Sequence, residues 1–269
     1  MNISSSSILI TGASGGIGGA IARQLAGKGA ALIIIDRDSS RADSLAIELR
    51  AMGAKNVFPL VGDLTQPHMP TRMIEEALNQ AGDIDILINC AGTQNFGFFA
   101  NEAIIDTAKL FNINTIAPIA LTNAVLPHML KMKKGQIVNL GSIFGSIGFP
   151  CFATYSASKF ALRGFSEALR RELVGSGVKV TYVAPRFTRT PFNRSAVTRM
   201  ADAMKMNQDE PEVVAASVIA AIERNGQDSY LGWPEKLFVR INSIFPRLVD
   251  KPLMKQVAQM RPFATEGAC

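Results

Sequence analysis

The segment Ile8-Leu9-Ile10-Thr11-Gly12-Ala13-Ser14-Gly15-Gly16-Ile17-Gly18 decides the fold of this chain. An apolar run that enters a glycine-rich turn and continues into a helical pattern is typical of a unit that binds a dinucleotide. Glycine suits such a turn because the backbone takes unusual dihedral angles and approaches a pyrophosphate closely. The following helix presents its first N–H groups and its positive dipole end to the phosphates.

Seven short apolar runs alternate with amphipathic segments along the chain. The runs lack polar alternation, as expected for strands buried on both faces of a parallel sheet. The pattern predicts an α/β fold, a doubly wound parallel sheet of about seven strands (Rossmann fold), in a single catalytic domain over residues 1–269. The predicted strands are Ile8–Thr11, Ala31–Asp36, Asn56–Val61, Ile84–Asn89, Gln136–Leu140, Lys179–Ala184 and Ser229–Leu231.

The last of the predicted core helices has signals at both ends. We expect it from Pro211 to Arg224, with Asp209 as N-cap and Asn225-Gly226 closing its last turn. Two earlier helices are expected from Gly16 to Lys28 and from Arg41 to Met52.

Residues 234–269 form a predicted C-terminal helical extension, packed on or near the substrate site. Its apolar residues fall on one helical stripe, although Pro246 interrupts any long helix. Three interpretations stay open: a flap over the substrate mouth, a subunit contact, or a basic amphipathic surface on a membrane. The stripe consists of Leu237, Phe238, Ile241, Ile244, Phe245 and Leu248, with Lys236, Arg240 and Arg247 nearby.

Composition narrows the class of protein further. A chain of 269 residues with 48% hydrophobic residues can bury a large core. Its net charge of +6 fits an enzyme for anionic cofactors better than a nucleic-acid-binding protein, because basic and aromatic residues are not interleaved. No long uninterrupted apolar run and no signal peptide are apparent, so we expect no transmembrane helix. Cys90, Cys151 and Cys269 have no metal-ligand spacing, so we expect no metal and a reduced, cytoplasmic protein.

Asp36 ends the second predicted strand. An acidic side chain there accepts hydrogen bonds from both ribose hydroxyls and repels a 2′-phosphate, although it could also cap a helix. Arg37 follows and could contact a 2′-phosphate. We therefore expect NAD to be preferred, with NADP possible. At the next strand end, Asp63 and Leu64 are expected against the adenine.

Tyr155-Ser156-Ala157-Ser158-Lys159 places a phenol and an ammonium on one face of a predicted helix. A phenol has a pKa of about 10 in water, and a neighbouring ammonium lowers that pKa. Tyr155 can then give or take the proton of a substrate hydroxyl. Ser142, at the end of the fifth predicted strand, could hydrogen-bond the substrate oxygen. Tyr and Lys at this spacing usually form a surface pair with no catalytic role. The residues around them therefore decide whether this pair indicates catalysis.

Those surroundings make the chain resemble the short-chain dehydrogenase/reductase family, in its single-domain, tyrosine-dependent branch. The resemblance runs from about Ile8 to Thr190. Its motifs match in order and spacing: Thr11-Gly12-x3-Gly16-x-Gly18, Asn89-x-Ala91-Gly92, Asn114, Ser142 and Tyr155-x3-Lys159.

The resemblance implies a role for each matching residue. Tyr155 would be the general acid/base, Lys159 would also bind the nicotinamide ribose, and Ser142 would orient the substrate oxygen. Asn114 would hold a water that links Lys159 to solvent. Asn89 would contact the cofactor ribose. The remaining implied cofactor residues are Gly12, Ser14, Gly15, Gly16, Ile17, Gly18, Ala91, Gly92, Pro185 and Thr190.

The resemblance also bears on cofactor choice and on assembly. Members that prefer NADP often carry a basic residue where this chain has Gly15, so the resemblance supports NAD. It implies a homodimer or homotetramer. One position departs from the family pattern, because Arg186 follows Pro185 where the family usually has glycine. Arg186 could shape the site, reach a substrate anion or point to solvent.

Bulky apolar residues crowd the loops expected around the nicotinamide. They favour a lipophilic alcohol or ketone, such as an acyl, retinoid-like or steroid-like compound, although such residues often belong to a core. Arg186, Arg189, Arg194 and Arg199 could meet an anionic head group. The candidate substrate residues are Phe96, Phe144, Phe149, Arg186, Phe187 and Phe192.

Three functions remain at this point. The leading one is an oxidoreductase that transfers a hydride between NAD(H) and a secondary alcohol or ketone. The second is an NADPH-dependent 3-oxoacyl-thioester reductase, favoured by the arginines and disfavoured by Asp36. The third is a non-catalytic dinucleotide-binding sensor, which the presence of Ser142, Tyr155, Lys159 and Asn114 disfavours.

Overall fold

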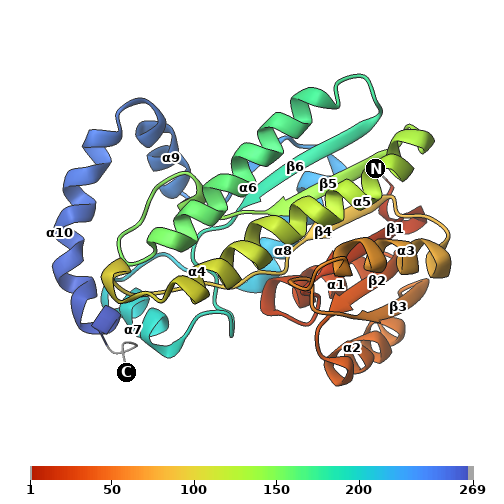
Figure 1. Ribbon diagram of the computed structural model, residues 1–269, viewed down its shortest axis with the longest axis horizontal. Helices are drawn as coiled ribbons and strands as arrows, with labels where there is room; N and C mark the ends of the chain where they lie inside the picture. The colour runs from red at the N-terminus through yellow and green to blue at the C-terminus, as the bar shows by residue number, and fades with distance from the viewer. Residues whose placement is uncertain (1, 266–269) are drawn as a thin grey trace.

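The computed structural model describes residues 2–265, and a seven-stranded parallel sheet runs through its centre (Figure 1). The strand order is β3-β2-β1-β4-β5-β6-β7. Every predicted strand is present, with ends that agree within two residues. The strands are β1 (Ser7–Thr11), β2 (Ala31–Asp36), β3 (Asn56–Val61), β4 (Ile86–Asn89), β5 (Gly135–Leu140), β6 (Val178–Ala184) and β7 (Asp228–Tyr230).

Helices cover both faces of the sheet, as the alternating pattern predicts. On one face lie α1 (Gly16–Gly27), α2 (Ser39–Ala51) and α8 (Pro211–Glu223). The other face carries α3 (Met69–Ala81), α5 (Ala117–Met132) and α6 (Ala153–Glu172), which stand in front of the sheet in Figure 1.

Alternate residues of each central strand feed two separate apolar cores. Ile8 and Ile10 of β1 pack toward α1 and α8, whereas Leu9 between them packs toward α3 and α5. All three side chains are fully buried. A strand with both faces covered has no solvent face, and this explains why its sequence shows no polar alternation.

The chain reverses its direction of winding between β1 and β4. From β1 it proceeds outward to β2 and β3, then returns to β4 on the other side of β1. In open α/β sheets, ligands bind at the carboxyl ends of the strands at such a point. The predicted site residues that follow β1 and β4 therefore meet at this edge.

A continuous helical run spans Ile104–Met132 and consists of α4 (Ile104–Phe111), the π-helical turn η3 (Asn112–Ile116) and α5. Within residues 2–265 it alone is long and apolar enough to cross a membrane by length and composition. About 44% of its most apolar window is buried in the protein, where the run contacts α3 and α6. A helix buried in the core of a protein can be equally long and apolar, so length and composition alone do not indicate a membrane span.

The C-terminal extension forms two helices, α9 (Glu235–Ile244) and α10 (Pro246–Thr265), as far as the described residues reach. They lie at the opposite end of the molecule from α2 (Figure 1). The predicted single stripe is divided, because the chain turns at Phe245 and Pro246 begins a new helix. α10 contacts α7 (Ser195–Ala203), and α9 contacts the 3-10 turn η4 (Ile143–Gly145). The cysteine predicted to be reduced at position 269 lies outside the described residues.

The prediction of Asp209 as the N-cap of α8 is wrong. The cap position belongs to Glu210, whose side chain makes no capping hydrogen bond. Asp209 is one residue too early, and both of its carboxylate oxygens accept hydrogen bonds from Arg186. Asp209 therefore binds Arg186, which is distant in the sequence, and does not cap α8 as the local sequence pattern predicted.

Two glycines of α1, one at each end of the helix, should respond differently to substitution by alanine. A Cβ at Gly18 would lie 2.2 Å from the carbonyl oxygen of Gly12, whereas a Cβ at Gly27 meets nothing within 4 Å. We expect Gly18→Ala to destabilise the fold by about 1–3 kcal/mol through overpacking. We expect Gly27→Ala to be neutral or to stabilise it by about 0.5–1 kcal/mol. Urea unfolding of both variants checks this, and equal effects would contradict the proposed clash.

Candidate active site

A cavity of about 1370 Å³ opens at the carboxyl ends of β1, β4, β5 and β6. It runs from the turn before α1 to the tail helices. Most of the predicted site residues line it: Gly12, Ser14, Gly15, Gly16, Ile17, Gly18, Asp36, Arg37, Asp63, Leu64, Ala91, Gly92, Ser142, Phe144, Phe149, Tyr155, Lys159, Pro185, Arg186, Phe187, Thr190 and Phe192.

The turn between β1 and α1 is a cradle that side chains would fill. Gly12 has a φ of +64°, and a Cβ there would lie 2.8 Å from the Cα of Ala91. A Cβ at Gly16 would lie 2.4 Å from the Cγ2 of Thr190. The turn leads directly into the N-terminus of α1, where free N–H groups and the helix dipole favour an anion. These features fit a dinucleotide pyrophosphate.

Asp36, Arg37 and Arg41 lie at the adenosine end of the cradle. Asp36 is half-buried at the end of β2, and its carboxylate accepts a hydrogen bond from the Ser14 hydroxyl. Arg37 is exposed and lines the cavity. Arg41 lines it too and donates to the Ser14 carbonyl at 2.7 Å, a contact that sequence reasoning missed. Asp36, which would repel a 2′-phosphate, thus lies beside two cations that would attract one.

Asp63 lies at the same end of the cavity, after β3. Its carboxylate accepts hydrogen bonds from the backbone and the hydroxyl of Thr65, at 3.0 and 2.7 Å. These bonds hold the pKa of Asp63 below its ordinary value, with a smaller contribution from nearby Arg37. The carboxylate therefore stays ionised and fixes the loop in which Leu64 lies.

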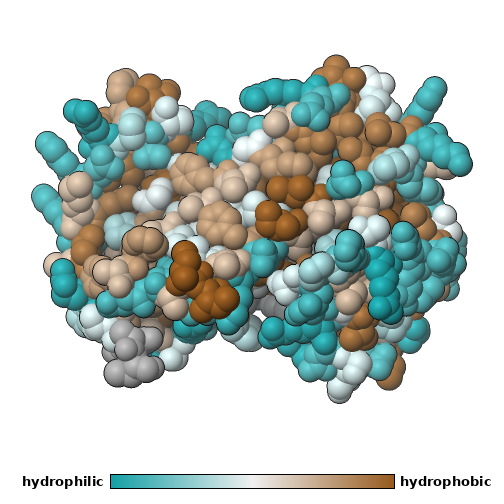
Figure 2. All heavy atoms as spheres, viewed as in Figure 1, coloured by the Kyte–Doolittle hydropathy of each residue, from teal (hydrophilic) through white to brown (hydrophobic). Residues whose placement is uncertain are grey.

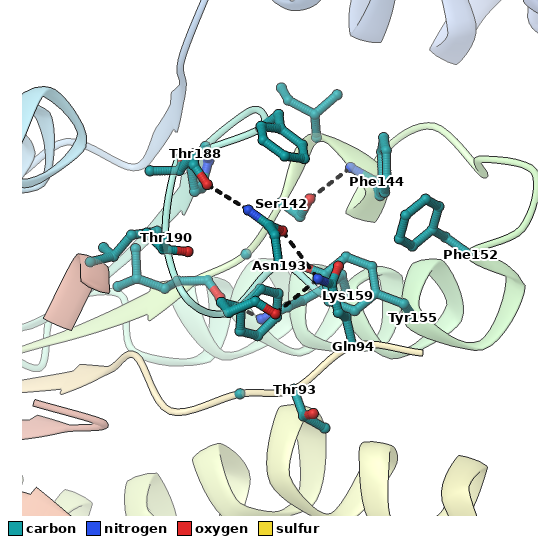
Figure 3. Close-up of a pocket in the computed structure, with 18 of the residues that line it drawn as sticks. Thr93, Gln94, Ser142, Phe144, Phe152, Tyr155, Lys159, Thr188, Thr190 and Asn193 are labelled. Carbon is teal, nitrogen blue, oxygen red and sulfur yellow. Dashed lines mark hydrogen bonds between the residues drawn. The ribbon is translucent and has the colours of Figure 1, made fainter. Parts of the chain in front are cut away.

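Ser142 and Tyr155 both line the cavity beyond the glycine turn (Figure 3). Ser142 caps η4, so its hydroxyl accepts a hydrogen bond from the Phe144 backbone at 3.1 Å. Tyr155 lies in the first turn of α6 and is only 8% exposed. Ser142 lies near enough to Tyr155 to lower the pKa of its phenol. Together they leave two hydroxyl groups where a substrate oxygen would lie.

Lys159 is buried one helical turn beyond Tyr155. Its Nζ lies 5.9 Å from the centre of the Tyr155 ring and donates a hydrogen bond to the Leu140 carbonyl at 2.9 Å. Leu140 ends β5, so this bond joins α6 to the sheet. The prediction that Tyr155 and Lys159 share one helix face is confirmed.

The pKa values differ from the sequence-based expectation. Burial raises the pKa of Tyr155 to about 12, and the hydrogen bond from Ser142 lowers it by less. Burial also lowers the pKa of Lys159 to about 8, which the nearby Cys90 thiol opposes. The expected depression of the Tyr155 pKa by Lys159 is therefore wrong for this arrangement, because desolvation of the phenol dominates.

Asn114 is fully buried in the π-helical turn η3. Its side chain accepts from the Thr93 backbone N–H at 2.8 Å and donates to the Thr93 carbonyl at 2.9 Å. It also donates to Ser158 of α6 at 3.1 Å. Asn114 does not line the cavity. It fastens the loop after β4 to the helix that carries Tyr155 and Lys159, and such π turns are frequent at functional sites.

Two further residues predicted for the site, Asn89 and Phe96, do not line the cavity. Asn89 was expected at the cofactor ribose, but its buried side chain donates to Asn139 of β5 at 2.8 Å and does not line the cavity. Phe96 was expected at the substrate, but it packs against Phe152 with ring centroids 5.0 Å apart, also away from the cavity. Strand pairing and aromatic packing take these side chains inward.

Arg186 is in the cavity wall but is held by two acids. It donates to both carboxylate oxygens of Asp209, at 3.0 and 2.7 Å, and to Glu235 at 3.1 Å. These carboxylates raise its pKa, and its side chain is 18% exposed. The interpretation that Arg186 binds a substrate anion is therefore not supported. It ties the loop after β6 to the start of α9.

The far end of the cavity is apolar. Phe144 stacks on Phe149 at 4.4 Å, and Phe152 and Phe192 each approach the Tyr155 ring within 6.3 Å. Side chains of α7 and of the tail helices also line the cavity. These additional lining residues are Val197, Met200, Met204, Met206, Phe238, Ile241, Leu248, Val249 and Leu253.

Sequence reasoning missed the support of Ser142. The fully buried Tyr182 of β6 places its hydroxyl 3.4 Å from the Ser142 nitrogen and 3.3 Å from the Ser142 carbonyl oxygen. Its ring fills the space beside Gly141 and Gly145, where a Cβ would lie 2.1 and 2.5 Å from it. Only the two glycines could have signalled this contact.

Sequence reasoning also missed a chain of hydrogen bonds at the site, which we call the polar strap and which consists of Gln94 and Asn193. Gln94 is buried, and its amide donates to the Phe192 carbonyl at 3.0 Å and to the Asn193 side chain at 3.1 Å. Asn193 in turn donates to the Thr188 carbonyl at 2.7 Å (Figure 3). The strap joins the loops after β4 and β6, which are far apart in the sequence.

Comparison with known proteins identifies the family. The family model described as short chain dehydrogenase matches residues 6–201. The ketoacyl reductase HetN of a Nostoc species is 32% identical over 250 residues, which cover 91% of this chain and 86% of that protein. A hydroxysteroid 11-beta-dehydrogenase 1-like protein A of Xenopus laevis is 34% identical over 251 residues, covering 91% and 84%. The chain belongs to the short-chain dehydrogenase/reductase family and is an oxidoreductase enzyme.

Two solved structures share the architecture. A family member from Burkholderia phymatum in complex with NAD gives a TM-score of 0.84 at 24% identity, covering 92% of this chain and 96% of that one. At this identity the match shows the fold alone. A short-chain dehydrogenase from Sphingobium yanoikuyae in complex with NADPH gives 0.77 at 29% identity, covering 93% and 95%.

The lowered pKa of Lys159 predicts a pH-dependent contribution to stability. In the folded protein this pKa is about 8, against an ordinary value of 10.5. Between these values the unfolded chain binds more protons, so stability rises with pH. We expect the free energy of unfolding of the wild type, relative to Lys159→Met, to rise by about 1–3 kcal/mol from pH 8 to pH 10.5. Urea unfolding of both proteins across this pH range measures the difference. A difference that does not change with pH would contradict the lowered pKa of Lys159.

Proposed function

We propose that the protein transfers a hydride between NAD(H) and a secondary alcohol or ketone of a lipophilic compound. One observation carries the proposal: Ser142, Tyr155 and Lys159 line one largely apolar cavity that continues into the glycine cradle. The family and the NADPH complex of a relative support a nicotinamide dinucleotide in that cradle.

The dinucleotide supplies the hydride acceptor or donor when it is bound. The remaining chemistry belongs to the residues of the chain. Ser142 orients the substrate oxygen by hydrogen bonding. Tyr155 donates its phenolic proton to that oxygen when a carbonyl is reduced, and accepts a proton when an alcohol is oxidised. At neutral pH its raised pKa keeps the phenol protonated, which is the form that reduction needs.

Lys159 and Asn114 support this proton transfer. The ammonium of Lys159 would stabilise a phenolate as it forms and would bind the nicotinamide ribose. Asn114 fixes the loop after β4 through its hydrogen bonds to the Thr93 backbone and to Ser158. Gly92 of this loop lies beside both groups, because a Cβ there would lie 3.1 Å from Asn114 Oδ1 and 3.8 Å from Lys159 Nζ. This placement supports a proton relay from Lys159 toward solvent.

The lining of the cavity supports an apolar substrate. Aromatic and methionine side chains surround the position beyond Tyr155. Of the four arginines considered for an anionic head group, only Arg186 lines the cavity, and two carboxylates already bind it. The guanidinium of Arg186, beside the expected position of the reacting carbon, is therefore not free to bind an anionic group of a substrate.

The second candidate is reduction of a 3-oxoacyl thioester with NADPH. The name of the Nostoc relative favours it, as do Arg37 and Arg41 at the adenosine end. The pairing of Arg186 disfavours it. A non-catalytic sensor is disfavoured because Ser142, Tyr155, Lys159 and Asn114 are all in place.

We also propose a homo-oligomer, dimer or tetramer, in the cytoplasm. Exposed apolar side chains on the helices in front of the sheet favour a subunit contact there. Ile104 of α4 is 80% exposed, Ile116 of η3 is 54% exposed and Phe160 of α6 is 42% exposed. Figure 2 shows apolar residues gathered on this face.

Turnover with a panel of secondary alcohols and ketones tests the reaction. The panel contains sugars, acyl thioesters, medium-chain ketones and steroids, each with NAD(H) and NADP(H). We expect lipophilic ketones to be reduced, and Tyr155→Phe to lose at least about 100-fold in kcat with unchanged cofactor binding. The matched control Tyr230→Phe, whose ring does not line the cavity, should keep its activity. Faster turnover of sugars would reject the lipophilic substrate, and retained activity of Tyr155→Phe would reject the mechanism.

Cofactor choice is tested at Asp36. Replacing Asp36 by Asn removes the charge that repels a 2′-phosphate but leaves Arg37 and Arg41. We expect the ratio of kcat/KM for NADPH to kcat/KM for NADH to rise by about tenfold or more. Asp43→Asn on α2, which is exposed and outside the cavity, is the control. If the wild type already prefers NADPH, the assignment of NAD is wrong and the acyl-thioester candidate gains support.

A further inference from the structure

The tail helices carry large apolar side chains on their outer surface. Ile244 is 68% exposed, Phe245 is 60% exposed and Leu248 is 64% exposed, all at the turn from α9 to α10. Met254 on α10 is 70% exposed, and Trp233 just before α9 is 71% exposed. Burying these groups would be favourable, and no element within residues 2–265 covers them.

Positive charges surround these apolar residues. Residues 236–255 contain five cations and a single acid, Asp250. All five cations are exposed, and none forms an ion pair within the part of the chain that the structure describes. Figure 2 shows apolar and hydrophilic residues side by side at this end of the molecule. The cations are Lys236, Arg240, Arg247, Lys251 and Lys255.

The active-site cavity opens toward this same surface. Phe238 of α9 is 46% exposed, yet it lines the cavity, and so does the exposed Leu248 of α10. Ile241, Val249 and Leu253 continue the lining inward from these two residues. The tail helices therefore have one apolar edge facing the cavity and another facing the outside.

We infer that the α9–α10 surface docks on an anionic lipid bilayer. Apolar side chains with a fringe of cations on amphipathic helices match the two forces that hold a protein on such a membrane. A second copy of the chain fits less well, because a symmetric contact would bring the same five cations face to face. A nucleic acid would leave Ile244 and Phe245 without apolar partners.

Docking would place the cavity mouth against the acyl region of the bilayer. A lipophilic ketone dissolved in the membrane could then pass between Phe238 and Leu248 without crossing water. This second step rests on the proposed function, whereas the docking surface does not. The membrane contact can therefore be tested without measuring any reaction.

Vesicle flotation of the full chain tests the surface. We expect binding to vesicles of phosphatidylcholine with phosphatidylglycerol, and weak binding to phosphatidylcholine alone. Arg247→Glu and Lys251→Glu should each weaken the partition coefficient by at least about fivefold, and Phe245→Ser by about tenfold. The controls Lys55→Glu and Ile47→Ser change exposed residues near α2, at the other end of the molecule, and should have no effect.

Two outcomes would overturn the inference. One is the absence of binding to any vesicle, and the other is binding that the tail variants leave unchanged. Light scattering distinguishes self-association from membrane binding. If the tail surface joins two copies of the chain instead, the wild type should not bind vesicles, and Phe245→Ser should form a smaller oligomer. Ile244 and Phe245 do not line the cavity, so their variants should keep kcat on a water-soluble ketone. Binding to vesicles without turnover of any ketone would reject the proposed function and leave the docking surface intact.

Discussion

The close approach of two backbones at the point between β1 and β4 is the constraint on which the site depends. The Thr11 hydroxyl accepts hydrogen bonds from the N–H groups of both Cys90 and Ala91, each at 3.0 Å. A Cβ at Gly12 would collide with Ala91 at 2.8 Å. One threonine and one glycine thus hold the turn before α1 against the loop after β4. The cradle and the loop after β4 therefore lie against each other, and both line the cavity that Ser142, Tyr155 and Lys159 also line.

Burial of the groups at this cavity changes their protonation chemistry. Tyr155 and Lys159 are both less than one-tenth exposed, and their pKa values move toward the neutral forms. Burial therefore opposes the ion pair that their spacing suggests. The hydrogen bond from Lys159 to Leu140 compensates in part, since a carbonyl favours the ammonium. A phenol that keeps its proton near neutrality is suited to protonating a substrate oxygen.

Local sequence determined the strands, the glycine turn and the positions of Ser142, Tyr155 and Lys159, and all of these could be predicted. Strand burial and helical spacing depend on neighbours along the chain, which the sequence shows directly. The directions of the Asn89, Phe96 and Arg186 side chains could not be predicted, for a different reason. Their directions depend on Asn139, Phe152 and the acids Asp209 and Glu235, which are distant in sequence. Tyr182 was missed because its target, Ser142, belongs to a neighbouring strand end.

Arg186 shows how a departure from the family pattern can connect parts of the site. Where the family usually has a small residue after Pro185, this chain has a guanidinium that binds Asp209 before α8 and Glu235 at the start of α9. Gly232 has a φ of +91°, a conformation that favours glycine, and a Cβ there would lie 2.6 Å from the Arg186 side chain. The arginine fixes where the tail leaves the sheet. Because Phe238 and Leu248 follow in that tail, the position of the cavity mouth depends on an ion pair that never touches the reacting atoms.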